Sequence, residues 1–309
     1  MSADPKLVDL LHLLRLHDYR FTTVTPATHS TVAARPCSGK ADLRDIFGWN
    51  KEFGRDDLEP AVLSLLEQAD ALDVLDAGLL RSRVRVASLG DDLFVHSAFP
   101  TDAEDAVFFG PDTYRFARFV AQHIAGCRPH THLVDMGTGS GAGGIATARR
   151  LQDPVITLVD VNGKALDYAK VNAAAAGVPV ETVQSDRVSD DFDVLIGNAP
   201  YLMDTARRAY RDGGDLFGGG VTLDWVRQGL ARLRPERTVL LYTGAAYVDG
   251  RAPLLDAIAD ECRTSEASLV IDEIDPDVFG DELLQPDYEK VERISAVGIR
   301  IGLPQSSSS

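Results

Sequence analysis

The segment best suited to chemistry ends a β-prone run: residues 193–197 are followed by Asn198, Ala199, Pro200 and Tyr201. One chemistry that such a segment could serve is reaction at a planar amide or aryl amine. This group is a poor nucleophile because its lone pair is delocalised, so an enzyme must orient the nitrogen and accept its protons. The Asn198 side-chain oxygen and the Ala199 carbonyl can each accept one N–H, Pro200 stiffens the turn, and the Tyr201 ring can lie over the planar group. We therefore predict Asn198, Pro200 and Tyr201 as catalytic residues; the alternative is that Asn-x-Pro is only a turn.

A glycine loop forms the second chemical feature. Gly137, Gly139 and Gly141 follow a β-prone run and precede a helical one, so the backbone can turn tightly and approach a ligand at the positive end of a helix. Asp135 lies two positions before the first glycine. Asp160 ends the next β-prone run, where a carboxylate can accept two hydrogen bonds from a ribose diol. The alternative for Asp160 is that it caps the helix that follows.

The elements that must position these residues begin at about residue 113, where short β-prone runs alternate with runs of helical length. This alternation predicts parallel βαβ units in a doubly wound sheet, with the ligand at the carboxyl ends of the strands. After a Pro- and Asp-rich connection, the last strand is a candidate for an antiparallel one. The seven expected strands cover residues 133–135, 155–161, 180–184, 193–196, 239–243, 269–274 and 294–301.

The first 80 residues have a different pattern. Leucines at 3/4 spacing, from Leu7 to Leu14 and again from Leu58 to Leu66, predict a small helical unit. Two β-prone runs around Gly90 predict a hairpin. We therefore expect four parts: a helical substrate-recognition domain (1–82), a β-hairpin linker (83–104), a ligand-binding domain (105–303) and a disordered tail (304–309).

These motifs together resemble a known family. The run from Asp135 to Asn198 resembles the class I S-adenosylmethionine-dependent methyltransferases, and Asn-Ala-Pro-Tyr is similar to their Asn-Pro-Pro-Tyr signature for planar nitrogens. Residues 107–114 resemble the Pro-Arg-Pro-Asp-Thr-Glu segment of HemK/PrmC-type glutamine N5-methyltransferases, which also carry an N-terminal helical domain and a hairpin linker. This chain departs from that segment at Phe109, Gly110 and Tyr114.

The resemblance implies an α/β, Rossmann-like, seven-stranded doubly wound sheet and S-adenosyl-L-methionine as the cofactor. It places Asp135 near the methionine amine, the glycine loop under the cofactor, Asp160 on the ribose and Asp186 at the adenine edge. The cofactor-binding residues so implied are Phe109, Pro111, Thr113, Asp135, Gly137, Thr138, Gly139, Gly141, Asp160, Val161, Asn162, Asp186, Arg187 and Asn198.

Substrate contacts are expected from Tyr114 and from Arg211 and Asp212, which belong to a glycine-rich segment (210–220) that forms either a lid or a plain surface loop. Its position after the catalytic motif suggests the lid, and the surface loop is an equal alternative.

Composition limits the partners. The chain has 309 residues, with 31 Lys and Arg against 47 Asp and Glu, so the net charge is −16 and a nucleic-acid acceptor is disfavoured. Three cysteines without CxxC spacing argue against disulfides and a zinc site, and we expect no metal. The sequence has no apolar run long enough to span a membrane, so we expect a cytoplasmic protein.

We therefore expect an N-methyltransferase acting on an amide or amine of a small molecule or a protein side chain. One alternative is an rRNA or tRNA base N-methyltransferase. Another is an S-adenosylmethionine-using enzyme that performs an internal cyclisation and releases methylthioadenosine. The oligomeric state is left open.

Overall fold

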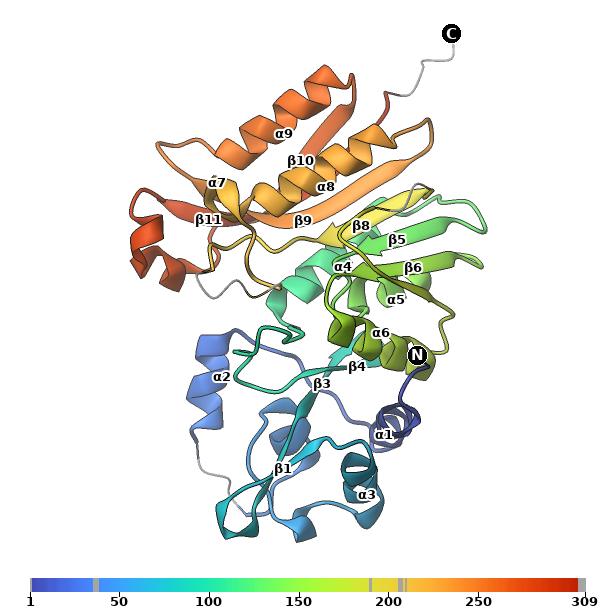
Figure 1. Cartoon of the computed structure of the whole chain (residues 1–309), viewed down its shortest axis with the longest axis vertical. Coiled ribbons are helices and arrows are strands. Elements are labelled where there is room, and N and C mark those ends of the chain that lie inside the picture. Colours follow the sequence, from blue (N-terminus) through green and yellow to red (C-terminus); the bar gives the residue numbers. More distant parts are fainter. Residues whose placement is uncertain (1, 36–38, 189–190, 205–207, 209, 305–309) are drawn as a thin grey trace.

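The structure is a computed structural model that describes residues 2–35, 39–188, 191–204, 208 and 210–304. A helical N-terminal unit lies at one end of the molecule and a sheet domain at the other (Figure 1). The sheet has seven strands in the order β10-β11-β9-β8-β5-β6-β7. Their bounds are β5 (His132–Met136), β6 (Val155–Asp160), β7 (Glu181–Gln184), β8 (Val194–Asn198), β9 (Thr238–Tyr247), β10 (Ser268–Asp275) and β11 (Arg293–Gly302).

The pairing confirms the predicted doubly wound sheet. Strands β5 to β9 pair in parallel, whereas β11 is antiparallel to both β9 and β10, as was considered for the last strand. Residues 194–197 of β8 are buried because helices cover both faces, which explains the continuous apolar run in the sequence. The strand order reverses at β5, so the crevice beside its carboxyl end is the expected ligand site.

Helices form one layer on each face of the sheet. On one face, α4 (Pro111–His123), α5 (Ala142–Ala148) and α6 (Gly163–Ala176) pack against one another and against β5, β6, β8 and β9. On the other face, α8 (Gly220–Ala231) and α9 (Pro253–Thr264) pack against β9 and each other, with the short α7 (Asp215–Gly218) before them (Figure 1).

The N-terminal unit contains α1 (Pro5–Leu16), α2 (Pro26–Ala33) and α3 (Pro60–Gln68), and the buried leucines of α1 confirm the predicted helical spacing. The linker hairpin is also confirmed, as β3 (Val84–Leu89) paired with β4 (Asp92–Ser97). A second small hairpin, β1 (Leu72–Val74) with β2 (Leu80–Ser82), was not predicted because three-residue strands are too short to show a two-residue period.

The core of this unit continues into the sheet domain. Val171 and Ala175 of α6 belong to the same buried cluster as Leu10 and Leu14 of α1. Of the predicted tail, only residue 304 is among the described residues; residues 305–309 lie outside them. In the described part of the chain, no helix is both long and apolar enough to cross a bilayer.

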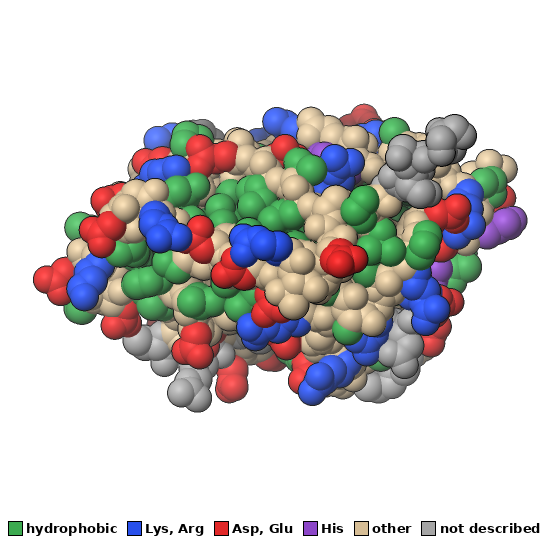
Figure 2. Space-filling view, turned by 90° about the horizontal axis from the view of Figure 1, so that it is seen from above, with side chains coloured by type: hydrophobic (Ala, Val, Ile, Leu, Met, Phe, Trp, Pro, Cys, Tyr) green, Lys and Arg blue, Asp and Glu red, His purple; other side chains and the backbone are tan. Residues whose placement is uncertain are grey.

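Figure 2 views the sheet domain from the end that carries α9 and β10. Basic and acidic side chains are interspersed on this face, and the basic ones do not gather into one continuous patch.

Candidate functional site

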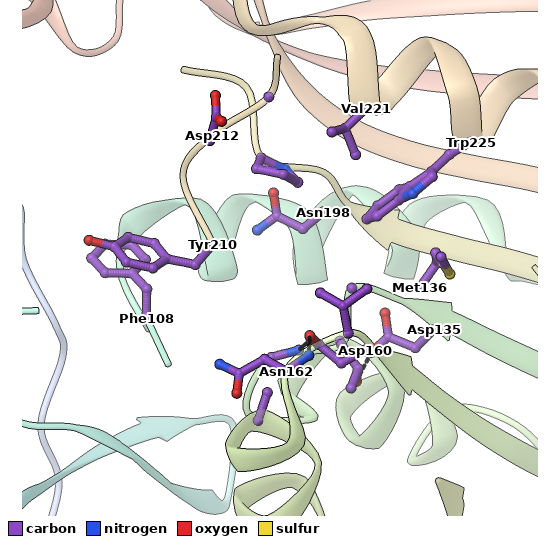
Figure 3. Close-up of a pocket in the computed structure, with 18 of the residues that line it drawn as sticks. Phe108, Asp135, Met136, Asp160, Asn162, Asn198, Tyr210, Asp212, Val221 and Trp225 are labelled. Carbon is purple, nitrogen blue, oxygen red and sulfur yellow. Dashed lines mark hydrogen bonds between the residues drawn. The ribbon is translucent and has the colours of Figure 1, made fainter. Parts of the chain in front are cut away.

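A cavity of about 560 Å³ opens at the carboxyl ends of β5, β6 and β8 (Figure 3). The ends of these strands, the glycine loop, α4 and α8 all contribute to its wall. This is the crevice at which a doubly wound sheet binds its ligand.

The glycine loop adopts a backbone that other residues rarely use. Gly137, Gly139 and Gly141 have φ values of +63°, +56° and +81°. A Cβ on Gly137 would lie 2.5 Å from Cη2 of Trp225, whereas no atom lies within 4 Å of the Cβ position of Gly139, which lines the cavity. The loop therefore offers a bare backbone cradle to a ligand, and Gly141 acts as the N-cap of α5.

Asp135 is a carboxylate buried beneath this cradle, with 1% of its surface exposed. Its Oδ2 accepts hydrogen bonds from the Thr138 hydroxyl (2.7 Å) and the Gly144 amide (2.8 Å). Burial raises the pKa of Asp135 to about 7, against the opposing effect of these two bonds and with a smaller contribution from the charge of Asp160. A cationic group beside Asp135 would restore its ionisation.

Asp160 does not cap α6, which was the alternative that the sequence offered for it. Its Oδ2 accepts from the Gly139 amide (2.8 Å) and its Oδ1 from the Asn162 amide (2.9 Å), so it fixes the cradle. Helix α6 is capped by Asn162, whose side chain accepts from the Lys164 amide. Because each carboxylate oxygen keeps a second lone pair, Asp160 can still accept two hydroxyl groups from the cavity. Burial raises the pKa of Asp160, although its hydrogen bonds from the Asn162 and Gly139 amides oppose the shift.

Asn198 ends β8 and lies on the wall of the main cavity, pointing toward its centre (Figure 3). Its side-chain amide has no hydrogen bond to any described residue of the chain. Asn198 also lines a second, adjoining cavity of about 90 Å³, which includes Ala199, Pro200 and Tyr201 in its wall. The two cavities therefore meet at the predicted catalytic segment.

Twelve of the predicted site residues line the main cavity, and the structure thus brings them together. They are Thr113, Asp135, Gly137, Thr138, Gly139, Asp160, Val161, Asn162, Asp186, Asn198, Pro200 and Asp212. Tyr201 lines only the smaller cavity, and its hydroxyl donates to Asp112 at 2.5 Å.

Four residues of the predicted cofactor set do not line either cavity: Phe109, Pro111, Gly141 and Arg187. Phe109 is 2% exposed and packs on His96 and Tyr114 in the core, so Phe108 contributes to the cavity wall in its place. The sequence could not separate two adjacent phenylalanines in an extended segment.

Two of the predicted substrate contacts point elsewhere. The Tyr114 hydroxyl bonds to the amide and hydroxyl of Thr23, at 3.0 and 3.1 Å, and so ties α4 to the N-terminal unit. The Arg211 guanidinium pairs with Glu282 and lies 3.7 Å from Asp204, although part of its side chain borders the smaller cavity.

The glycine-rich segment is closely packed where it passes Gly213 and Gly218. A Cβ on Gly213 would lie 1.7 Å from the Gly218 carbonyl oxygen, and one on Gly218 would lie 2.3 Å from the Tyr201 carbonyl oxygen. The glycines therefore let the chain fold tightly behind the loop that follows β8, while residues 214–216 of the segment are exposed. The role of the segment as a lid stays a prediction.

Several lining residues had no signal in the sequence. Val221, Asp224 and Trp225 come from α8, and Phe108 stacks on Tyr210 at the cavity wall with ring centroids 5.5 Å apart and planes 13° apart (Figure 3). Their positions depend on how distant segments fold together. Trp225 is nearly buried and also borders the cavity.

The charge of the main cavity is one-sided. The described lining residues include no Lys, Arg or His. They include six aspartates, which are Asp135, Asp160, Asp186, Asp212, Asp215 and Asp224. Such a lining favours a ligand that carries positive charge. The bare backbone cradle, the free acceptor sites of Asp160 and this acidic lining fit a sulfonium nucleoside with an amino group.

The chain was also compared with known proteins. Residues 106–211 match the model of the family described as "Methyltransferase small domain". Release factor glutamine methyltransferase of Deinococcus radiodurans is 31% identical over 160 residues, which cover 48% of this chain and 55% of that protein. The enzyme of the same description from Rhodopirellula baltica is 34% identical over 146 residues, which cover 43% of this chain and 48% of that protein. The chain thus spans about half the length of these relatives.

The crystal structure of Trm5b from Pyrococcus abyssi superposes with a TM-score of 0.50 and 12% identity, covering 75% of this chain and 62% of that one. At this identity the similarity concerns the fold alone.

The fold, the site and these matches define a class I methyltransferase fold with S-adenosyl-L-methionine as its cofactor. Within this class, the relatives reported above are release factor glutamine methyltransferases, to which the chain is similar over about half of its length, in line with the resemblance to the HemK/PrmC type.

Proposed function

We propose that the chain transfers a methyl group from S-adenosylmethionine to the nitrogen of a carboxamide, and that the acceptor is a glutamine side chain of a protein. The observation that carries this proposal is the side-chain amide of Asn198, which has no hydrogen bond to a described residue and lies at the junction of the main cavity and the cavity of about 90 Å³. The names of the relatives, which methylate a release factor glutamine, support the same acceptor class.

The charge of the main cavity favours a carboxamide over a nucleobase. Six aspartates line this cavity, and they would repel the phosphates attached to a nucleobase. The base-methylating alternative is therefore less favoured.

Each residue at the junction has a defined task. The Asn198 side-chain oxygen and the Ala199 carbonyl accept the two N–H groups and so orient the nitrogen. Asp160 holds the ribose hydroxyls, and Asp135 faces the amino group of the methionine moiety. When bound, S-adenosylmethionine supplies an electrophilic methyl carbon on a sulfonium centre. Phe108 and Tyr210 help to exclude water from the junction of the two cavities.

The test is to incubate the full chain with S-adenosylmethionine labelled in its methyl group and a bacterial release factor. We expect one methyl group on a glutamine and S-adenosylhomocysteine as the second product. Asn198→Ala should abolish transfer, while calorimetry shows cofactor affinity close to that of the unchanged protein.

Three outcomes would contradict the proposal. Label in RNA would favour base methylation, methylthioadenosine as product would favour internal cyclisation, and full activity of Asn198→Ala would remove this residue from the mechanism.

A further inference from the structure

A buried carboxylate, Asp112, lies in the wall of the smaller cavity and has no role in the mechanism above. It is the second residue of α4 and is 7% exposed. Its Oδ2 accepts from the Tyr201 hydroxyl at 2.5 Å, and its Oδ1 accepts from the Tyr242 hydroxyl at 2.8 Å and from Arg115 at 3.1 Å. A buried charge with three donors is held in one geometry, because the loss of a donor leaves part of it unpaired.

The Tyr201 ring is confined on its other sides. A Cβ on Gly244 of β9 would lie 2.0 Å from Cδ2 of Tyr201, so the ring lies directly on the bare backbone of that glycine. Phe279 contacts the ring edge to face, with centroids 5.6 Å apart. Within this slot, the hydrogen bond to Asp112 determines where the phenol end of the ring lies.

The Asp112 carboxylate is connected to both ends of the segment from Asn198 to Tyr201, directly at Tyr201 and through Tyr242 at Asn198. Tyr242 is the neighbour of Asn198 in the parallel pairing of β8 with β9, and its carbonyl accepts the Ala199 amide at 3.1 Å. Tyr201 is the last residue of the segment. Asp112 thus links the strand beside the first residue of the segment to the side chain of the last one.

An ion-pair chain connects Asp112 to β10 through Arg115. Arg115, which donates to Asp112, also donates to Asp275 at 2.8 Å. Burial, followed by the charge of Asp112, raises the pKa of Tyr201, so this phenol remains a proton donor.

We propose that Asp112 is a positioning residue for the methyl acceptor: it fixes Tyr201, and through it the segment from Asn198 to Tyr201, in the geometry that orients the acceptor nitrogen. This role rests on the proposed function. Asp112 acts on the transfer step and leaves cofactor binding unchanged, since it lines the smaller cavity and does not line the main one.

The kinetic test uses Asp112→Asn, Tyr201→Phe and the double variant, with a release factor as acceptor. A displacement of the acceptor by about 1 Å can cost about 10²-fold in rate, so each single variant should lower kcat by about that factor with an unchanged dissociation constant for S-adenosylmethionine. The double variant should be no slower than either single one, because neither single variant keeps the hydrogen bond from the Tyr201 hydroxyl to a carboxylate. Multiplicative losses, or kcat unchanged in Asp112→Asn, would overturn the proposal.

The matched control is Tyr19→Phe. Tyr19 is also buried and donates its hydroxyl to the Val86 carbonyl at 2.8 Å, but it lies in the core of the N-terminal unit. This variant should lose stability and keep kcat, which separates positioning from a general effect of removing a buried hydrogen bond. If it lowered kcat as much as Tyr201→Phe, the positioning role would be refuted.

A crystal structure of Asp112→Asn tests the same idea without an acceptor, and Tyr201→Phe replaces it if the first variant does not fold. We expect the Tyr201 ring, or the phenyl ring in its place, to leave its position over Gly244. An unchanged ring would refute the role of Asp112. If the unchanged protein methylates no protein, the proposed function fails, while this structure still decides the role of Asp112.

Discussion

The buried carboxyl of Asp135 should destabilise the ligand-free protein at neutral and alkaline pH. Its pKa is raised from 3.8 to about 7 by burial. Between these two values the folded state binds more protons than the unfolded state, so stability falls as pH rises from about 4 to about 7 and then levels off. A shift of about three pKa units corresponds to about 4 kcal/mol at pH 8, of which about 1.5 kcal/mol is already present at pH 5.

Asp135→Asn removes this cost and keeps an oxygen that can accept from Thr138 and Gly144. The free energy of unfolding is measured in urea for the ligand-free variant and the unchanged chain. The variant's advantage over the unchanged chain should be about 2 to 3 kcal/mol larger at pH 8 than at pH 5. Using the difference between two pH values cancels any effect of the substitution that does not depend on pH.

The control is Asp186→Asn, which removes a carboxylate that lines the same cavity but is exposed. It should leave the difference between pH 5 and pH 8 as it is in the unchanged protein. Equal pH dependence in Asp135→Asn and the unchanged chain would refute the reasoning. The variant should also bind S-adenosylmethionine less tightly, because it lacks the charge that we propose to face the amino group.

Two further predictions concern the cofactor cradle. Asp160→Ala should raise the dissociation constant of S-adenosylmethionine by about 10- to 100-fold, since hydrogen bonds to a charged group contribute about 1.5 to 3 kcal/mol; unchanged affinity in calorimetry would argue against the ribose contact. Gly137→Ala should lower the thermal midpoint, because the residue has φ of +63° and its Cβ would lie 2.5 Å from Trp225, and a midpoint equal to that of the unchanged protein would show that this approach is not tight.

The sequence predicted the sheet well because its signals are local. The apolar runs of β5, β6, β8 and β9 and the helical stretches between them show their period within a few residues. The glycine loop and Asn198 were found for the same reason, since each motif is contiguous and follows a strand whose end must face the cavity.

The rest of the site depends on tertiary contacts. Trp225 of α8 reaches the glycine loop, and Tyr210 stacks on Phe108 across about a hundred residues of sequence. Asp112 lies in the first turn of α4, and its bonds connect this helix to Tyr201 in the loop after β8 and to Tyr242 in β9. The spacing of residues along the sequence does not predict such contacts.

The same limit explains the corrected residues. Tyr114 and Phe109 lie next to residues that do line the cavities, but their side chains point toward the N-terminal unit and the core. At the start of a helix, the side chains of neighbouring residues point in different directions. The motif alone does not determine which of them faces the cavity.

The central claim is that S-adenosylmethionine lies across the carboxyl ends of β5, β6 and β8 with its methyl group toward Asn198. A crystal structure of the full chain soaked with S-adenosylmethionine tests it most directly. We predict the ribose hydroxyls on Asp160 and the sulfonium methyl facing the side chain of Asn198. A cofactor bound elsewhere, or one whose methyl group points away from Asn198, would contradict the account.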